Sequence, residues 1–168
     1  MNKVLKIAVF ALFLIGSATN LAAQKFGYVN SAGILAELPA VRAAEADLEA
    51  LQKQLQKRGE DMVKQFQTDV AALQQRVEAG ELSPQQQQQE GAKLEQRQQE
   101  IGQFEQKMVQ DLQEKRNELL EPIYADVNKA IEEVAKENGY TLIFDQQVLL
   151  YGEETQDVTA AVKSKLGI

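Results

Sequence analysis

Apolar residues recur at spacings of three, four and seven along two long stretches of this chain. The first stretch comprises Val41, Ala44, Leu48, Leu51, Leu55, Met62, Phe66, Val70, Leu73 and Val77. The second comprises Leu94, Ile101, Phe104, Met108, Leu112, Leu119, Ile123, Val127, Ile131 and Val134. Because these spacings bring apolar side chains to one face of a helix, they predict the seam of a coiled coil. Two helices of about 41 and 55 residues, roughly 60 and 80 Å long, are therefore expected to dominate the fold.

Local signals mark the ends of both helices. Pro39 suits the first position of the first helix, and Gly80 suits the left-handed residue that follows its last turn. Ser83 and Gln86 have the spacing of a capping box at the start of the second helix, and Gly139 ends that helix. The turn at 79–83 is short, so the two helices are predicted to form an antiparallel hairpin. We call this hairpin, residues 39–138, the arm.

The register of the arm follows from the centre of its turn, near residue 81 or 82. Residues that face each other should have numbers that sum to about 163, which pairs Gly59 with Phe104. A residue without a side chain then lies opposite a bulky ring, as close packing of the seam requires. The other predicted pairs are Leu55 with Met108, Leu51 with Leu112, Ala44 with Leu119 and Val41 with Ile123.

The distal third of the arm is predicted to be more compliant than its root. Residues 85–90 hold no apolar side chain. Gly91 and Gly102 each cost a helix interior about 1 kcal/mol relative to Ala. Pro122 lies inside the second helical pattern, where it removes a backbone hydrogen bond and favours a kink. We expect this kink, near residue 122, to mark the place where the arm enters the rest of the protein.

Residues 24–38 and 139–168 are predicted to form a small β-rich body. Strands are expected at 25–29, 140–144 and 148–151, the last two forming a hairpin. A short helix should run from Ser31 to about Glu37, and a last helix, capped by Asp157, should end at Leu166 and Gly167.

A body of about 45 residues without disulfides or metal rarely encloses a sufficient core, and oligomerisation is the usual remedy. Consecutive apolar residues in the predicted hairpin indicate that both of its faces are covered. We therefore expect a subunit interface on the body. The residues assigned to it are Phe26, Tyr28, Leu142, Phe144, Val148 and Leu150.

The composition argues against most enzyme classes. The chain has no His and no Cys, which removes the common general base, the thiol nucleophile and the usual zinc ligands. No phosphate-binding G-x-x-x-x-G-K-[ST] motif is present, so ATP is not an expected ligand. The formal net charge of −7 argues against a nucleic-acid partner. No catalytic residue, cofactor site or metal site is predicted.

The first 23 residues have the order of a secretory signal peptide. Lys3 and Lys6 precede an apolar run from Ile7 to Ile15, and small residues recur up to Ala23. The run is less than half of the roughly 20 residues that a membrane-spanning helix needs. Cleavage after Ala23 would remove two lysines, so the net charge would change from −7 to −9. A periplasmic protein without disulfides is the expected product.

The order of short motifs at the two ends of the mature chain is distinctive. The motifs are F-G-Y-V-N-S (Phe26 to Ser31), I-L-A-E-L-P-A-V (Ile34 to Val41), P-I-Y-A-D-V-N-K-A-I (Pro122 to Ile131), G-Y-T-L-I-F-D (Gly139 to Asp145), L-Y (Leu150 and Tyr151) and D-V-T (Asp157 to Thr159). With the Gln- and Glu-rich hairpin between them, they resemble the Skp/OmpH family of periplasmic chaperones. The resemblance covers the whole mature chain.

This resemblance implies a mainly α fold with a small β body, assembled as a jellyfish-like homotrimer. Three arms would surround a cavity that holds unfolded outer-membrane β-barrel proteins. Better-known members are basic, with arms suited to anionic clients and lipopolysaccharide. Residues 50–120 of this chain hold 10 basic and 12 acidic side chains. Because of that departure, no lipopolysaccharide site is carried over, and the client-binding residues stay unassigned.

Two functions from different classes fit these features. The leading hypothesis is an ATP-independent holdase that keeps apolar strand segments of its clients from pairing with one another. The alternative is a periplasmic coiled-coil structural or adaptor protein that bridges two membranes. An adaptor of this kind needs flanking β domains for docking, and the ends of this chain are short for that purpose.

Overall fold

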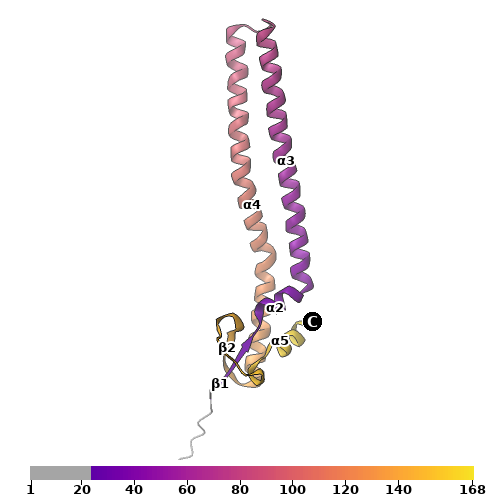
Figure 1. Cartoon of the computed structure of the whole chain (residues 1–168), viewed down its shortest axis with the longest axis vertical. Helices are drawn as coiled ribbons and strands as arrows, with labels where there is room; N and C mark the ends of the chain where they lie inside the picture. Colours follow the sequence, from indigo (N-terminus) through magenta and orange to yellow (C-terminus); the bar gives the residue numbers. More distant parts are fainter. Residues whose placement is uncertain (1–23) are drawn as a thin grey trace, which may run out of the picture.

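The computed structural model describes residues 24–168, which form a long helical hairpin rising from a small body (Figure 1). Strand β1 (Lys25–Val29) and helix α2 (Ser31–Glu37) lead into the two arm helices, α3 (Pro39–Glu78) and α4 (Pro84–Asn138). This arrangement confirms a mainly α fold with a small strand component. The expected signal peptide lies outside the described residues.

The chain then returns to the body. Strand β2 (Tyr140–Asp145) is followed by two 3₁₀ turns, η1 (Gln146–Val148) and η2 (Glu154–Gln156), and by the last helix, α5 (Thr159–Leu166). The predicted strands at 25–29 and 140–144 are therefore confirmed. None of the helices among residues 24–168 combines the length and the apolar character needed to cross a membrane.

The ends of the arm helices match the sequence signals. Pro39 opens α3, and after its last residue Gly80 adopts φ +71°. The amide of Gly80 donates to the carbonyl of Val77, and that of Glu81 donates to the carbonyl of Arg76, which completes a Schellman motif. At the start of α4 the Ser83 and Gln86 side chains form the predicted capping box. The turn is therefore set by local hydrogen bonds.

The seam has the predicted register at its centre. A Cβ built on Gly59 would lie 3.4 Å from the ring of Phe104, so the missing side chain does face the bulky one. The only buried residues of α3 are Ala44 and Leu55, both in the half near the body. Towards the tip, Val70 and Val77 are more than a third exposed. Apolar burial therefore decreases along α3 towards the tip, and Leu82 in the turn is buried again.

The two strands of the body pair in parallel, with Phe26 opposite Leu142 and Tyr28 opposite Phe144. A parallel pair needs a crossover connection, and here that connection is the whole arm. Both ends of the arm are consequently held together by one small sheet.

The core of the body lies between β1, α2, α5 and the last turns of α4. Its buried residues are Val29, Ile34, Leu38, Val127, Ala130, Val134, Val158 and Val162. The helix α4 thus belongs to the arm at its start and to the body at its end. Pro122 lies inside α4, which continues as a helix to Asn138, and the kink expected at this proline stays a prediction.

Ion pairs join the last helix to α2, which leads into the arm, and to the end of α4. Lys163 Nζ lies 2.7 Å from a carboxylate oxygen of Glu37 on α2, and Lys165 Nζ lies 2.5 Å from one of Glu137 on α4. Val162, on the same helix, is fully buried. The short helix α5 therefore ties the start of the arm to its end.

The prediction of a third strand is wrong. The sequence predicted residues 148–151 as a strand paired with 140–144, but Gln146–Val148 form a 3₁₀ turn and the following residues are irregular. The carboxylate of Asp145 accepts a hydrogen bond of 2.8 Å from the amide of Gln147, which caps this turn. That cap ends β2 and turns the chain away, so the apolar run after it does not pair with the free edge of β2.

The start of the last helix is one residue later than predicted. Val158 is the N-cap of α5, and Asp157 precedes it. The carboxylate of Asp157 still accepts a hydrogen bond of 2.8 Å from the amide of Thr159, the first residue of the helix. Asp157 is displaced because it forms a bridge with Tyr28 of β1, whose carbonyl accepts from the Val158 amide at 2.9 Å. The predicted end at Leu166 and Gly167 is confirmed.

Substitutions at Gly59 should report the packing of the seam. Gly59→Ala should be neutral or should raise the free energy of unfolding by up to about 1 kcal/mol, because Ala is the better helix former and its Cβ fits against Phe104. Gly59→Phe should lower it by roughly 1 to 3 kcal/mol through overpacking. Urea unfolding followed by circular dichroism measures both, and equal stability of the two variants would contradict this register.

Candidate binding surfaces

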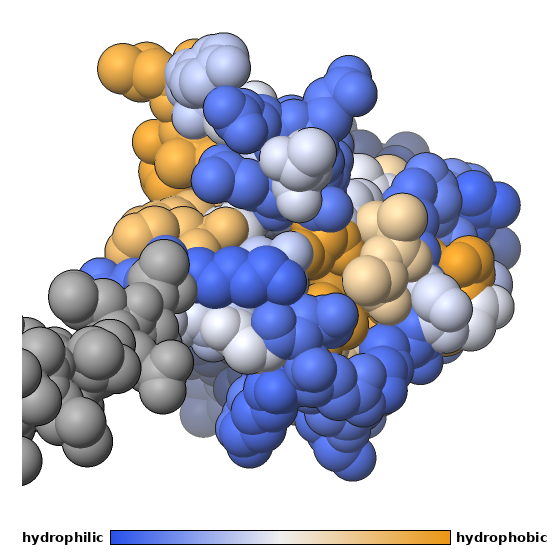
Figure 2. All heavy atoms as spheres, turned by 90° about the horizontal axis from the view of Figure 1, so that it is seen from below, coloured by the Kyte–Doolittle hydropathy of each residue, from blue (hydrophilic) through white to orange (hydrophobic). Residues whose placement is uncertain are grey.

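An exposed apolar face lies on the sheet of the body. Phe26, Leu142 and Phe144 are 39%, 51% and 40% exposed, and the register of the strands places them on one side of the sheet. The rings of Phe26 and Phe144 lie 6.4 Å apart, centroid to centroid, within the range of aromatic pairs. Figure 2 views the body end of the molecule and shows apolar side chains exposed among hydrophilic ones. We call these three residues the sheet patch.

The loop after β2 adds a second exposed apolar group. Val148, Leu150 and Tyr151 all protrude, and the side chain of Leu150 contacts solvent on every side. Tyr151 was not among the predicted interface residues. No periodic pattern surrounds it, and only its position next to Leu150 in an apolar run distinguishes it in the sequence.

Tyr28 differs from the other predicted interface residues because its own chain buries it. Its ring packs against Gly152, where an added Cβ would come within 2.6 Å. Burial of the ring, together with the nearby charges of Asp157 and Glu154, raises the pKa of Tyr28 above its ordinary value. Tyr28 is therefore a neutral packing residue that holds the loop at Gly152 against β1.

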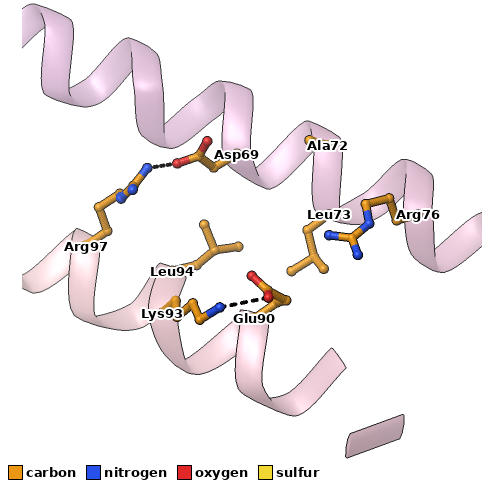
Figure 3. Close-up of a pocket in the computed structure, with 8 residues that line it drawn as sticks. All are labelled: Asp69, Ala72, Leu73, Arg76, Glu90, Lys93, Leu94 and Arg97. Atoms are coloured by element: carbon orange, nitrogen blue, oxygen red, sulfur yellow. Dashed lines mark hydrogen bonds and ion pairs between the residues drawn. The ribbon is translucent and has the colours of Figure 1, made fainter. Parts of the chain in front are cut away.

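A polar pocket of about 260 Å³ lies between α3 and α4 near the tip of the arm (Figure 3). Its lining residues are Asp69, Ala72, Leu73, Arg76, Glu90, Lys93, Leu94 and Arg97. Asp69 on α3 forms an ion pair with Arg97 on α4, which links the two helices directly. Leu94 lies between this pair and the ion pair of Glu90 with Lys93, and Leu73 lies next to Glu90 on the side of Arg76.

Each carboxylate of the tip pocket lies against a basic side chain. A hydrogen bond from Lys93, followed by the charge of the same lysine, lowers the pKa of Glu90. Both acidic residues thus act as ion-pair partners of basic side chains. No group of acidic residues within 24–168 has the geometry of a metal site.

Two apolar grooves accompany the arm. The first, about 580 Å³, lies midway along the arm around Gly59 and Phe104, and Val63, Ile101 and Met108 contribute to its floor. The second, about 560 Å³, follows α4 near the body and includes Leu120 and Tyr124. A set of shallow apolar surfaces with few convergent polar groups suits the binding of a polypeptide better than that of a small molecule.

Comparison with known proteins gives this architecture a family. The family model described as "Outer membrane protein (OmpH-like)" matches residues 25–166, which include both strands and the whole arm. The chain belongs to the OmpH-like family. No curated protein sequence matches it significantly.

A solved structure has the same fold as this OmpH-like protein. It is the crystal structure of a protein from Caulobacter crescentus CB15 assigned as an outer membrane chaperone (OmpH-like). The TM-score is 0.74 at 15% sequence identity, and the match covers 85% of this chain and 83% of that one. At 15% identity this likeness shows a shared fold, which agrees with the family match over residues 25–166.

The ion pair between Asp69 and Arg97 should support the distal arm locally. Arg97→Gln removes a link between α3 and α4, whereas Lys53→Gln removes an ion pair within α3, with Glu49, and the same positive charge. Each variant should change the global free energy of unfolding by less than about 1 kcal/mol, because both pairs are partly solvated. Hydrogen exchange of backbone amides near Leu94 should be faster in Arg97→Gln only. Equal exchange in the two variants would contradict a supporting role.

Proposed function

We propose that this protein is an ATP-independent periplasmic holdase that binds unfolded outer-membrane β-barrel proteins and prevents their aggregation. The observation that carries the proposal is the unpartnered sheet patch on a body whose core holds only eight buried residues. Such a body gains stability by association, and association of several copies would place several arms around one space.

A homotrimer assembled through the body accounts for the exposed apolar residues. The edge of β2 that does not pair with β1 remains available to another copy, as do the sheet patch and the protruding loop at Leu150. The proposed interface consists of Phe26, Tyr28, Leu142, Phe144, Val148 and Leu150, with Tyr28 contributing from within the body. The expected signal peptide at residues 1–23 supports export to the periplasm.

The arms provide the proposed contact surface for clients. An unfolded β-barrel protein exposes segments that alternate apolar and polar residues, and these segments aggregate by pairing edge to edge. Several arms around one cavity would separate the segments through many weak contacts, with no need for ATP or for sequence recognition. Light scattering of the mature protein, alone and with a urea-unfolded outer-membrane protein, tests this function directly.

Loss of the arms should separate assembly from client binding. A variant in which a short Gly/Ser loop replaces residues 50–115 should remain trimeric, because the proposed interface lies in the body, and should no longer suppress aggregation. Sedimentation and light scattering measure the two properties. A folded monomer would refute the body interface, and full suppression of aggregation without arms would refute the cavity.

Salt should have little effect on client binding, or should strengthen it, between about 0.05 and 0.5 M. The mature chain is acidic and repels acidic clients, and salt screens that repulsion while apolar burial persists. Titration of an unfolded outer-membrane protein at several salt concentrations measures the effect. A steep loss of affinity with added salt would instead assign binding to basic clusters such as Lys53, Lys57 and Arg58.

A further inference from the structure

The groove midway along the arm has an apolar floor that the seam leaves open. Gly59 contributes no side chain, so the edge of the Phe104 ring is uncovered on this side, next to Val63 and Met108. The guanidinium of Arg58 lies 5.2 Å from the centre of the same ring, within cation–π range. Phe104 is therefore held by its own chain and still presents apolar surface to the groove. We call this the mid-arm groove.

The rim of the mid-arm groove carries charged side chains that form no ion pair within the arm. Many charged residues of the arm pair along their own helix, as Lys107 does with Asp111 at 2.7 Å. Glu60, Lys64 and Glu105 line the groove, and none of the ion pairs found among residues 24–168 involves them. Gln56 and Gln67 complete the rim with amide groups. The groove thus combines an apolar floor with free donors and acceptors at its edges.

These features are complementary to an extended polypeptide. A strand exposes backbone N–H and C=O groups. Glu60 and Glu105 can accept hydrogen bonds from the N–H groups, and Lys64 can donate hydrogen bonds to the carbonyl oxygens. From Gln56 to Gln67 the groove is about 16 Å long. Side chains on one face of a strand recur about every 7 Å, so the groove has room for two or three of them. Its volume of about 580 Å³ is sufficient for that number of apolar side chains.

We propose that the mid-arm groove binds an extended client segment, with alternate aromatic or branched aliphatic side chains on its floor and the backbone along its charged rim. This inference rests on the proposed holdase function and assigns to it a defined subsite on each arm. A polar segment would leave the floor without apolar contacts, so the groove selects strands with at least one apolar face.

Two valines on the same helix provide a matched test. Val63 lies in the groove and Val70 lies one heptad further along α3, outside it, and both are 37% exposed. The probes are a urea-unfolded outer-membrane β-barrel protein and a ten-residue peptide that alternates Phe or Val with Thr. In the full-length mature protein, Val63→Ser should raise the Kd for both probes about three- to tenfold, as expected for the loss of one or two buried methyl groups. Val70→Ser should stay within about twofold of the wild type.

A second measurement locates the peptide without any substitution in the protein. With benzoylphenylalanine at its central apolar position, the peptide should crosslink on illumination to Met108 or Val63, which mass spectrometry of the digested product identifies. If the wild type fails to bind the unfolded protein, the holdase function itself is refuted. If the wild type binds but the two valine variants behave alike, or crosslinks form only outside the groove, the subsite is refuted and the function stands.

Discussion

The parallel pairing of β1 with β2 is the constraint on which the rest of the molecule depends. It joins segments separated by the entire arm, and closing so long a loop costs conformational entropy that the small sheet cannot offset alone. The buried contacts of Ile34, Val134 and Val162 and the ion pairs of α5 supply the remaining stability of this closure. Because the same few residues hold both roots of the arm, the direction in which the arm leaves the body is set there.

The arm divides its stability unevenly between local and seam interactions. Capping groups at Ser83 and Gly80 fix the turn, and burial of Ala44 and Leu55 stabilises the root. Between Leu55 and the turn, no residue of α3 is buried. There the ion pair between Asp69 and Arg97 connects the two helices. A hairpin built in this way can keep both ends in register while the segment between them offers apolar surface to water.

The sequence was a reliable guide where a single residue decides the local geometry. The start at Pro39, the left-handed Gly80 and the capping box at Ser83 each depend on neighbouring backbone groups alone, and the seam register followed from the turn. The expectation of a strand at residues 148–151 failed because a strand requires an edge, and the Asp145 cap directs this segment away from β2. The shift at Asp157 has the same origin, a tertiary bridge to Tyr28 that no local pattern encodes. The mid-arm groove could not be predicted from the sequence either. The pairing of Gly59 with Phe104 suggests close packing, and it does not indicate the opening beside the pair.

Charge and apolar surface have separate roles along this arm. Oppositely charged side chains pair within one helix turn, as in Glu49 with Lys53 and Lys107 with Asp111. Such pairs add solubility but create little long-range electrostatic field. What remains for a partner is the apolar floor beside Phe104 and the few unpaired rim charges around it. Each such contact is weak because the groove is shallow and open to water. Several arms acting on one unfolded chain would convert weak contacts into a long residence time, and release would need no more than the loss of a few of them.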